Sequence, residues 1–229
     1  MDTVFDSAPT YRSASEINQA MGRVYGHMSL AVLISMLVSY FVGSTPELVK
    51  FFFTGVMHWV VIFAPLVFVL LVPIMFNAGI GRVGAMLLLD AFAALMGLSF
   101  AVIFAIYTMG SIFTAFMGAA ILFSVMSFYG YFTKKDLSGM GELMIIGLIA
   151  VIIASIINIF IGSTVMQMVI SAISIIIFTG LTAYDTQKIR EDLMDNPNEH
   201  AEIFGAMTLY LDFINLFLSL LQLFGVKKD

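Results

Sequence analysis

The sequence predicts an all-α integral membrane protein, a bundle of seven transmembrane helices with the last helix at its centre. Hydrophobic residues make up 61% of the 229 positions and charged residues 11%, more apolar surface than a soluble single domain could bury. Seven apolar stretches reach the roughly 20 residues that cross a bilayer. Polar side chains in the last stretch recur on one helical face, which suits a helix enclosed by other helices.

The seven spans follow one another with short connections. We expect them at residues 24–42, 56–76, 83–107, 112–132, 142–161, 165–184 and 203–226. These runs lack the alternation of barrel strands, and backbone groups in lipid must bond internally, so each span is helical. Pro65 and Pro73 should bend or break the second span. The chain divides into a polar, cytoplasmic N-terminal arm (residues 1–22) and one seven-helix domain (residues 23–229) that has the lipid bilayer as its surroundings.

Basic residues indicate the orientation of the bundle. Of the ten Lys and Arg residues, the side of the N-terminal arm receives Arg12, Arg23, Arg82, Lys134, Lys135, Lys188 and Arg190, and the opposite side receives Lys50, Lys227 and Lys228. The positive-inside rule therefore predicts a cytoplasmic N-terminus. Lys227 and Lys228 disagree with seven full crossings. The alternative is a last run that dips into the membrane and returns to the cytoplasm.

Composition excludes several classes of function. The formal net charge is -5, and no basic cluster suits nucleic acid. The chain has no cysteine, which rules out disulfides, iron–sulfur clusters and thiolate zinc sites. Histidines and carboxylates form no close cluster in the sequence, so we expect neither a transition-metal site nor a tightly bound cofactor. We expect a membrane protein that is not an enzyme.

The last span carries a seam of polar residues. Its members follow one another in steps of four, three, four and three residues, which places them on one face: Thr208, Asp212, Asn215, Ser219 and Gln222. Asn and Ser would suit hydrogen bonds between helices. An aspartate at membrane depth costs roughly 2.5 to 3.5 kcal/mol on insertion scales, so it is usually kept for ion movement, proton relay or buried pairing. Asp212 is therefore the leading candidate for function.

The preceding span carries a comparable face, formed by Ser171, Ser174, Thr182 and Asp185. The boundaries above put Asp212 about 14 Å deep and Asp185 at the membrane boundary. Starting the last helix at Met207 and extending the previous one to Ile189 would bring the two level. Carboxyls that meet in a low dielectric share a proton, and losing it creates an oxygen-rich site for a hard cation such as Ca²⁺. Alone, Asp185 could simply end its helix at the interface.

Three stretches carry a resemblance to a known family: residues 183–189 (AYDTQKI), 209–217 (LYLDFINLF) and 134–138 (KKDLS). The chain resembles bacterial members of the Bax-inhibitor family, the transmembrane Bax-inhibitor-motif proteins, over essentially everything after the N-terminal arm. The resemblance implies a seven-helix protein of the bacterial inner membrane that acts as a pH-sensitive Ca²⁺ leak or channel, with Asp185 and Asp212 as its proton-sharing sensor. It also implies an arginine latch to this pair, for which Arg82 is the candidate.

Other polar residues are secondary candidates. Arg82 would equally suit an ordinary positive-inside anchor. Asp90, within the third span, could supply another cation oxygen, take protons, or be a buried acid partnered by Arg82 or a hydroxyl. Thr182, Asn215 and Ser219 are candidate accessory groups of the same pathway. The metal binding we expect is transient contact of Ca²⁺ with Asp185 and Asp212.

Two other functions compete with a pH-gated Ca²⁺ pathway. An intramembrane aspartyl protease also needs two facing carboxylates that share a proton, but the Gly-x-Gly-Asp pattern is missing because Leu209, Tyr210 and Leu211 precede Asp212. A non-conducting regulator that binds other membrane proteins would use the aspartate pair as a structural lock. A leak and a coupled H⁺/Ca²⁺ exchanger are equally compatible with a shared proton.

Overall fold

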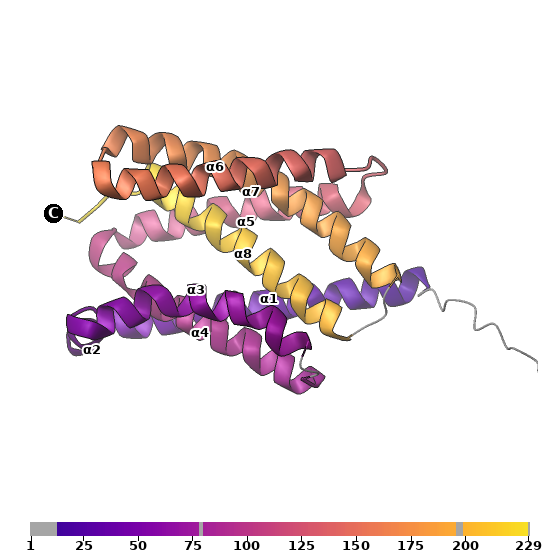
Figure 1. Ribbon diagram of the computed structural model, residues 1–229, viewed down its shortest axis with the longest axis horizontal. Coiled ribbons are helices and arrows are strands. Elements are labelled where there is room, and N and C mark those ends of the chain that lie inside the picture. Colours follow the sequence, from indigo (N-terminus) through magenta and orange to yellow (C-terminus); the bar gives the residue numbers. More distant parts are fainter. Residues whose placement is uncertain (1–12, 78–79, 196–198, 229) are drawn as a thin grey trace, which may run out of the picture.

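The regular structure of the described residues is helical (Figure 1). The computed structural model describes residues 13–77, 80–195 and 199–228. In chain order the helices are α1 (Ala14–Gly43), α2 (Pro46–Phe52), α3 (Gly55–Asn77), α4 (Arg82–Ile106), α5 (Met109–Phe132), α6 (Ser138–Ile161), α7 (Thr164–Asp195) and α8 (Glu199–Phe224). Arg12 and the first part of the predicted N-terminal arm lie outside the described residues.

The helices confirm the all-helical membrane class. Six of the described helices, α1 and α4 to α8, are long and apolar enough to cross a membrane, and the pair α2 and α3, bent by 81°, makes a seventh if it is counted as one broken span. The break lies next to Gly55, whose φ of 61° is a conformation that glycine adopts readily. Helix α3 runs through Pro65 and Pro73, so these prolines do not break the helix, and the bend that was the other expectation stays a prediction. The count of seven crossings stays a prediction.

Several helices extend beyond the predicted spans. Helix α1 begins ten residues early, at Ala14, because Ser13 and Glu16 form a capping box, in which the Ser13 N–H donates to the Glu16 carboxylate at 2.7 Å. Helix α7 continues to Asp195, and α8 already begins at Glu199. With 30 residues, α1 is about 45 Å long, so its ends project beyond about 30 Å of hydrocarbon.

Small residues bring α1 and α4 into close contact. A Cβ atom on Gly97 would lie 2.6 Å from the backbone oxygen of Ser35, so nothing larger than glycine fits there without a shift. The Ser35 hydroxyl donates to the backbone oxygen of Ala93 at 2.7 Å and forms a second hydrogen bond, also 2.7 Å long, with the Tyr210 hydroxyl of α8. This single buried hydroxyl therefore joins three helices.

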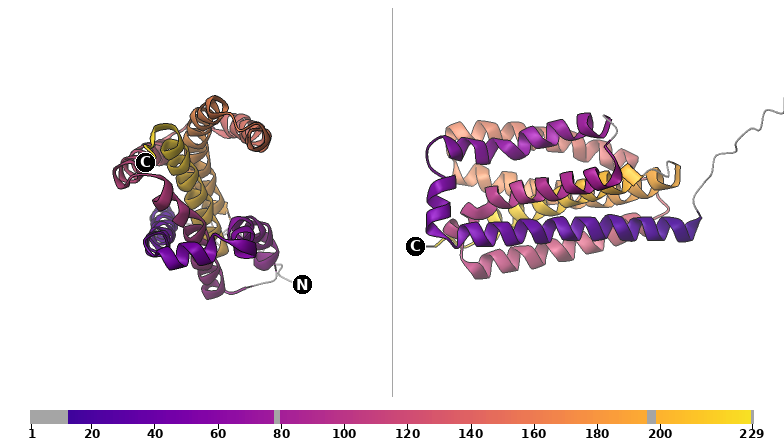
Figure 2. Two further views of the ribbon diagram at one scale, coloured as in Figure 1. Left: turned by 90° about the vertical axis from the view of Figure 1, so that its left-hand side faces the viewer. Right: turned by 90° about the horizontal axis from the view of Figure 1, so that it is seen from below.

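Helices α1, α3 and α4 gather on one side of the bundle and α6 and α7 on the other, and α8 crosses obliquely from the first group toward the second (Figures 1 and 2). Helix α8 packs against α1, α4, α5 and α7. In the 18-residue apolar stretch of α8, 67% of the residues are buried, whereas in that of α6 only 6% are buried. Since α8 is one continuous helix, the alternative in which the last run turns back inside the membrane was wrong.

The residues after α8 pair with the connection between α4 and α5. The Thr108 N–H donates to the Val226 oxygen at 3.0 Å, and the Lys228 N–H donates to the Ile106 oxygen at 2.8 Å. The Lys228 ammonium also donates to the Phe104 oxygen at 2.6 Å, so it caps the C-terminal end of α4 with a positive charge. The tail is thereby fixed at the end of the bundle opposite the start of α1.

We call the end where α1, α4, α6 and α8 begin the basic end. Six of the nine Lys and Arg residues in the described part of the chain lie near it: Arg23, Arg82, Lys134, Lys135, Lys188 and Arg190. The α5–α6 turn at this end is held by local hydrogen bonds, since the Ser138 N–H donates to Asp136 at 2.8 Å. Hydrogen bonds from the Ser138 hydroxyl and N–H hold the pKa of the Asp136 carboxyl below its usual value.

Candidate functional site

Two carboxyl groups meet between α7 and α8. Asp212 is 4% exposed and Asp185 is half-buried, and their side chains lie within hydrogen-bonding reach of each other. Two carboxyls form a hydrogen bond only if one of them holds a proton. Within the described residues, no N–H or hydroxyl donor reaches the buried Oδ2 atom of Asp212. The group with which the Asp212 carboxyl can share a proton is therefore the Asp185 carboxyl.

Longer helices bring the two aspartates level. Asp185 lies ten residues before the end of α7 at Asp195, and Asp212 lies thirteen residues after the start of α8 at Glu199. At about 1.5 Å per residue these positions are roughly 15 and 20 Å from the α7–α8 connection. The sequence analysis brought the two residues level by starting the last helix only at Met207. That detail was wrong, because α8 begins at Glu199 and both helices continue well past the predicted membrane boundary.

The hydroxyl and amide groups near the pair are satisfied within their own helices. Thr182 donates to the Phe178 oxygen at 2.7 Å, and Asn215 donates to the Leu211 oxygen at 2.8 Å. Such bonds to the preceding turn are the usual way in which polar side chains are accommodated in a buried helix. The remaining lone pairs of the Thr182 and Asn215 oxygens stay available to a cation.

The polar faces of α7 and α8 meet a second time, toward the end opposite the basic end. Gln222 of α8 accepts hydrogen bonds from Gln167 at 2.7 Å and from Ser171 at 3.1 Å. Asn158 of α6, 6% exposed, donates to Gln167 at 3.3 Å. Between this amide cluster and the aspartates lie the buried hydroxyls of Ser174 and Ser219. The sequence predicted the two faces but missed the amides of Gln167 and Asn158.

Arg82 forms an ion pair with a buried glutamate. Glu202, 2% exposed, accepts two hydrogen bonds from Arg23 of α1, from Nε at 2.7 Å and from Nη2 at 2.6 Å. Arg82 of α4 lies 3.9 Å from the same carboxylate. Sequence analysis identified Arg82 as a candidate latch to the aspartate pair and missed Glu202, whose position directly before the last apolar run was the available signal. We call these three residues the Glu202 cluster.

Asp90, the accessory candidate of the third predicted span, lies in α4. It is half-buried, about 12 Å along the helix from Arg82, and its accessory role stays a prediction. Among the described residues, no group of three or more His, Asp or Glu side chains gathers where it could hold a metal ion. Any Ca²⁺ at the aspartate pair would therefore complete its coordination with backbone, hydroxyl or water oxygens.

Two of the stretches singled out in the sequence form one unit at the basic end. Gln187, two residues after Asp185, accepts from the Leu137 N–H at 2.9 Å and donates to the Lys135 oxygen at 2.8 Å. One helix position earlier, the Thr186 hydroxyl bonds the Ser127 hydroxyl of α5 at 3.2 Å. The α5–α6 turn is thus attached directly to the segment of α7 that carries Asp185.

Comparisons with known proteins agree with the family resemblance that these stretches carry. Residues 17–229 match the family model Bax1-I, Inhibitor of apoptosis-promoting Bax1. The chain is 38% identical over 215 residues to the inner membrane protein YbhL of Escherichia coli, which covers 91% of this chain and 92% of that protein. It is 36% identical over 220 residues to an uncharacterized protein of Rickettsia prowazekii, covering 93% and 92%. The chain therefore belongs to the Bax inhibitor family, as its motifs predicted.

Proposed function

We propose that this protein is a pH-dependent Ca²⁺ pathway, a leak channel or transporter of the bacterial inner membrane, gated by Asp185 and Asp212. The observation that carries the proposal is the buried Asp212 carboxyl facing Asp185 between α7 and α8. Two carboxylates in contact away from water cannot both ionise cheaply, so they share one proton. The state of this interface should therefore follow pH.

The two protonation states act in opposite directions on the α7–α8 interface. With one proton shared, a hydrogen bond between Asp185 and Asp212 holds the two helices together and closes the path. Loss of that proton leaves two adjacent negative charges, which repel each other and attract a divalent cation whose preferred ligands are oxygens. Ca²⁺ flux should therefore increase as pH rises.

A row of polar side chains between α7 and α8 supports a route across the membrane. From the aspartates it continues through the buried hydroxyls of Ser174 and Ser219 to the amide cluster around Gln222. Hydroxyl and amide oxygens at these positions would replace part of the hydration shell of a passing ion, as polar linings do in channels. We assign Thr182 and Asn215 the same accessory role beside the aspartates.

We also propose the arrangement of the bundle in the membrane. The chain crosses seven times, with the bent pair α2 and α3 as the second crossing and α8 in the middle. The N-terminus and the basic end face the cytoplasm, because six of the nine described Lys and Arg residues lie there. The name of the relative in Escherichia coli, an inner membrane protein, supports the same membrane for this chain.

Ca²⁺ flux into dye-loaded liposomes that contain the purified protein tests the function. We expect flux in the native protein to increase as pH is raised from about 6 to about 8, because loss of the shared proton leaves two adjacent carboxylates that repel each other and attract Ca²⁺. In Asp185→Asn and Asp212→Asn the hydrogen bond no longer needs a shared proton, because the N–H of the new amide donates to the remaining carboxylate. Flux in both variants should therefore lose its dependence on pH.

Asp192→Asn is the matched control, since Asp192 lies two turns after Asp185 on the same helix but is 53% exposed and paired with Lys188. It should keep the native pH profile. The reasoning fails if both Asn variants retain that profile. If the folded native protein moves no Ca²⁺ at any pH, the competing function, a non-conducting regulator of other membrane proteins, replaces it. Proton counterflow, followed with a pH dye in the same liposomes, separates an exchanger from a leak.

A further inference from the structure

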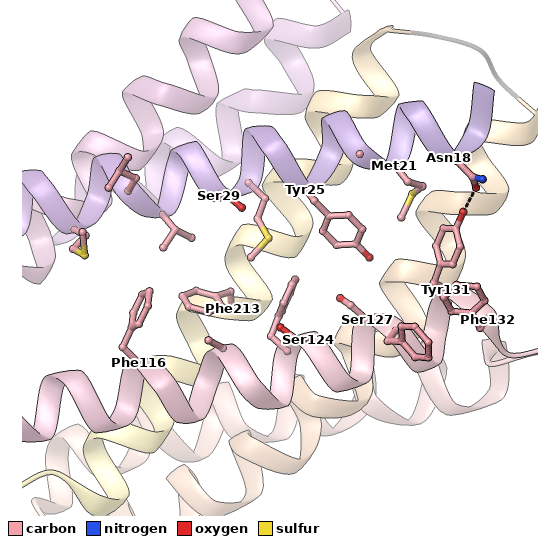
Figure 3. A pocket seen from close by; sticks show the side chains of 18 residues that line it. Asn18, Met21, Tyr25, Ser29, Phe116, Ser124, Ser127, Tyr131, Phe132 and Phe213 are labelled. Carbon is pink, nitrogen blue, oxygen red and sulfur yellow. Dashed lines mark hydrogen bonds between the residues drawn. The ribbon is translucent and has the colours of Figure 1, made fainter. Parts of the chain in front are cut away.

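A groove separates α1 from α5 on the outside of the bundle (Figure 3). Its cavity measures about 760 Å³ and is walled by α1 and α5, with Phe213 of α8 at its floor. A second cavity of about 400 Å³ continues it and shares Val32, Met36, Phe116 and Phe213 with it. We call the two together the α1–α5 groove. Their volumes fall within the range of sites that bind small molecules, roughly 300 to 1,000 Å³.

The groove opens toward the surroundings of the membrane-spanning helices. Its rim consists of large apolar side chains from both walls, with Leu33 and Met36 of α1 each 45% exposed and Phe128 and Phe132 of α5 65% and 63% exposed. On helices that cross a bilayer, such side chains face hydrocarbon. A molecule that enters the groove therefore arrives from within the bilayer, and its buried part must be apolar.

The lining changes from polar to apolar along α1. At the basic end the Tyr131 hydroxyl donates to Asn18 (Figure 3). About 10 to 16 Å further along α1 lies a patch of hydroxyl groups that belong to Tyr25, Ser29, Ser124 and Ser127. Beyond it the lining residues are aliphatic and aromatic apart from Ser35 and Ser39, whose hydroxyls donate to the backbone oxygens of Ala93 and Met36. Since α1 projects from the membrane at its ends, this order matches the depth profile of a phospholipid: headgroup, ester region, acyl chain.

A positive charge lies at the polar end of the groove. The Arg190 guanidinium sits over the Tyr131 ring, 5.2 Å from its centroid. Its Nε atom is buried and has no hydrogen-bond acceptor within the described residues. Lys134 and Lys135 follow closely after α5 and are exposed at the same end. A guanidinium beside a site that opens to lipid favours a phosphate group, whose charge and oxygen atoms suit it as a partner.

We propose that the α1–α5 groove binds an anionic phospholipid, with the phosphate at Arg190, the ester groups on the hydroxyl patch and one acyl chain in the apolar part. Bound in this way, the lipid would touch Tyr25 and Ser127, whose hydroxyls lie beside that of Thr186. Thr186 is the neighbour of Asp185 in α7. The binding proposal itself does not depend on ion conduction, because it rests on the shape, polarity and charge of the groove.

Native mass spectrometry of the purified protein with added phosphatidylglycerol or phosphatidylcholine of the same acyl chains tests the proposal. We expect the native protein to retain phosphatidylglycerol at least about tenfold better, equivalent to roughly 1.4 kcal/mol. Ser124→Trp places an indole inside the groove and should abolish retention. Val125→Trp is the matched control, since Val125 is the next residue, 59% exposed, and does not line the groove; it should retain lipid as the native protein does.

Two further variants make each part of the proposal refutable. Arg190→Gln should remove the preference for phosphatidylglycerol, and an unchanged preference would overturn the headgroup assignment. Ser29→Trp blocks the groove from the opposite wall and replaces Ser124→Trp if the latter does not fold, as judged by thermal unfolding. Native-like lipid retention in a folded groove variant, or no retention by the native protein, would overturn the site.

Discussion

Removing Arg23 should destabilise the protein more than removing its partner Glu202. The two residues form a double hydrogen bond at 2.6 and 2.7 Å, but they differ in exposure, since the Arg23 side chain is 41% exposed and that of Glu202 is 3% exposed. The perturbations are Arg23→Gln and Glu202→Gln. Each substitution deletes one charge and keeps a hydrogen-bonding side chain. The difference in stability between the two variants therefore reports which of the remaining charges is harder to accommodate.

The magnitudes follow from what remains in each variant. Arg23→Gln leaves a buried carboxylate with Arg82 at 3.9 Å as its counter-charge; losing a partner of a buried pair costs about 3–5 kcal/mol, and Arg82 reduces this to roughly 2–3 kcal/mol. Glu202→Gln leaves a guanidinium that water can reach, at a cost of about 1 kcal/mol. We therefore expect a difference of about 1–2 kcal/mol, with the arginine variant less stable.

Thermal unfolding in one detergent, followed by helical circular dichroism, measures this difference. For a chain of this size each kcal/mol lowers the midpoint by about 2–4 °C. Lys188→Gln is the control, because Lys188 and Asp192 are both 53% exposed and 3.7 Å apart, and an exposed pair is worth about 0–1 kcal/mol. A midpoint for Arg23→Gln equal to or above that of Glu202→Gln would refute the reasoning.

Three other perturbations test the packing and the turn at the basic end. Gly97→Ala forces a Cβ to within 2.6 Å of the Ser35 backbone, whereas Gly118→Ala meets its nearest side-chain atom at 3.4 Å. The first should therefore lower the free energy of unfolding by about 1–3 kcal/mol, and equal unfolding midpoints for the two variants would contradict this. Tyr210→Phe removes the hydrogen bond to Ser35 and should cost about 1 kcal/mol; an unchanged midpoint would show that the bond contributes nothing. The Asp136 carboxyl has a lowered pKa, so its bonds hold the α5–α6 turn at every pH above its usual pKa of about 3.9 and are lost as pH falls through the lowered value. The protection factors of the turn amides, which are exchange rates corrected for the intrinsic effect of pH, should stay constant from about pH 8 to pH 5, and a loss of protection within that range would contradict the assignment.

The aspartate pair could be predicted from the sequence because helical periodicity is a local property. Asp212 occurs at the spacing of a polar seam, and α7 and α8 are consecutive, so two acidic residues on facing seams had few alternative partners. Their levels could not be predicted. Helix ends depend on tertiary packing: α7 continues past its apolar run because residues such as Thr186 and Leu193, both 0% exposed, are buried against neighbouring helices.

The Glu202 cluster lay beyond sequence reasoning for a different reason. Arg23 and Glu202 are 179 positions apart, and a charge near a predicted membrane boundary is equally compatible with water, lipid headgroups or a buried partner. Which arginine reaches the glutamate is decided by the packing of α1 against α4 and α8. That packing depends on close approaches such as the one at Gly97, whose consequence for charges elsewhere on the helix cannot be deduced from local sequence.

The burial of α8 also bears on how the chain enters the membrane. Its two buried acids, Glu202 and Asp212, are synthesised after α1, α4 and α7, which supply Arg23, Arg82 and Asp185. Because chains emerge with the N-terminus first, both acids enter a membrane that already holds their partners, and neither needs to be exposed to bare hydrocarbon at a cost of several kcal/mol. A circularly permuted chain that began with α8 would lose this protection and should insert poorly.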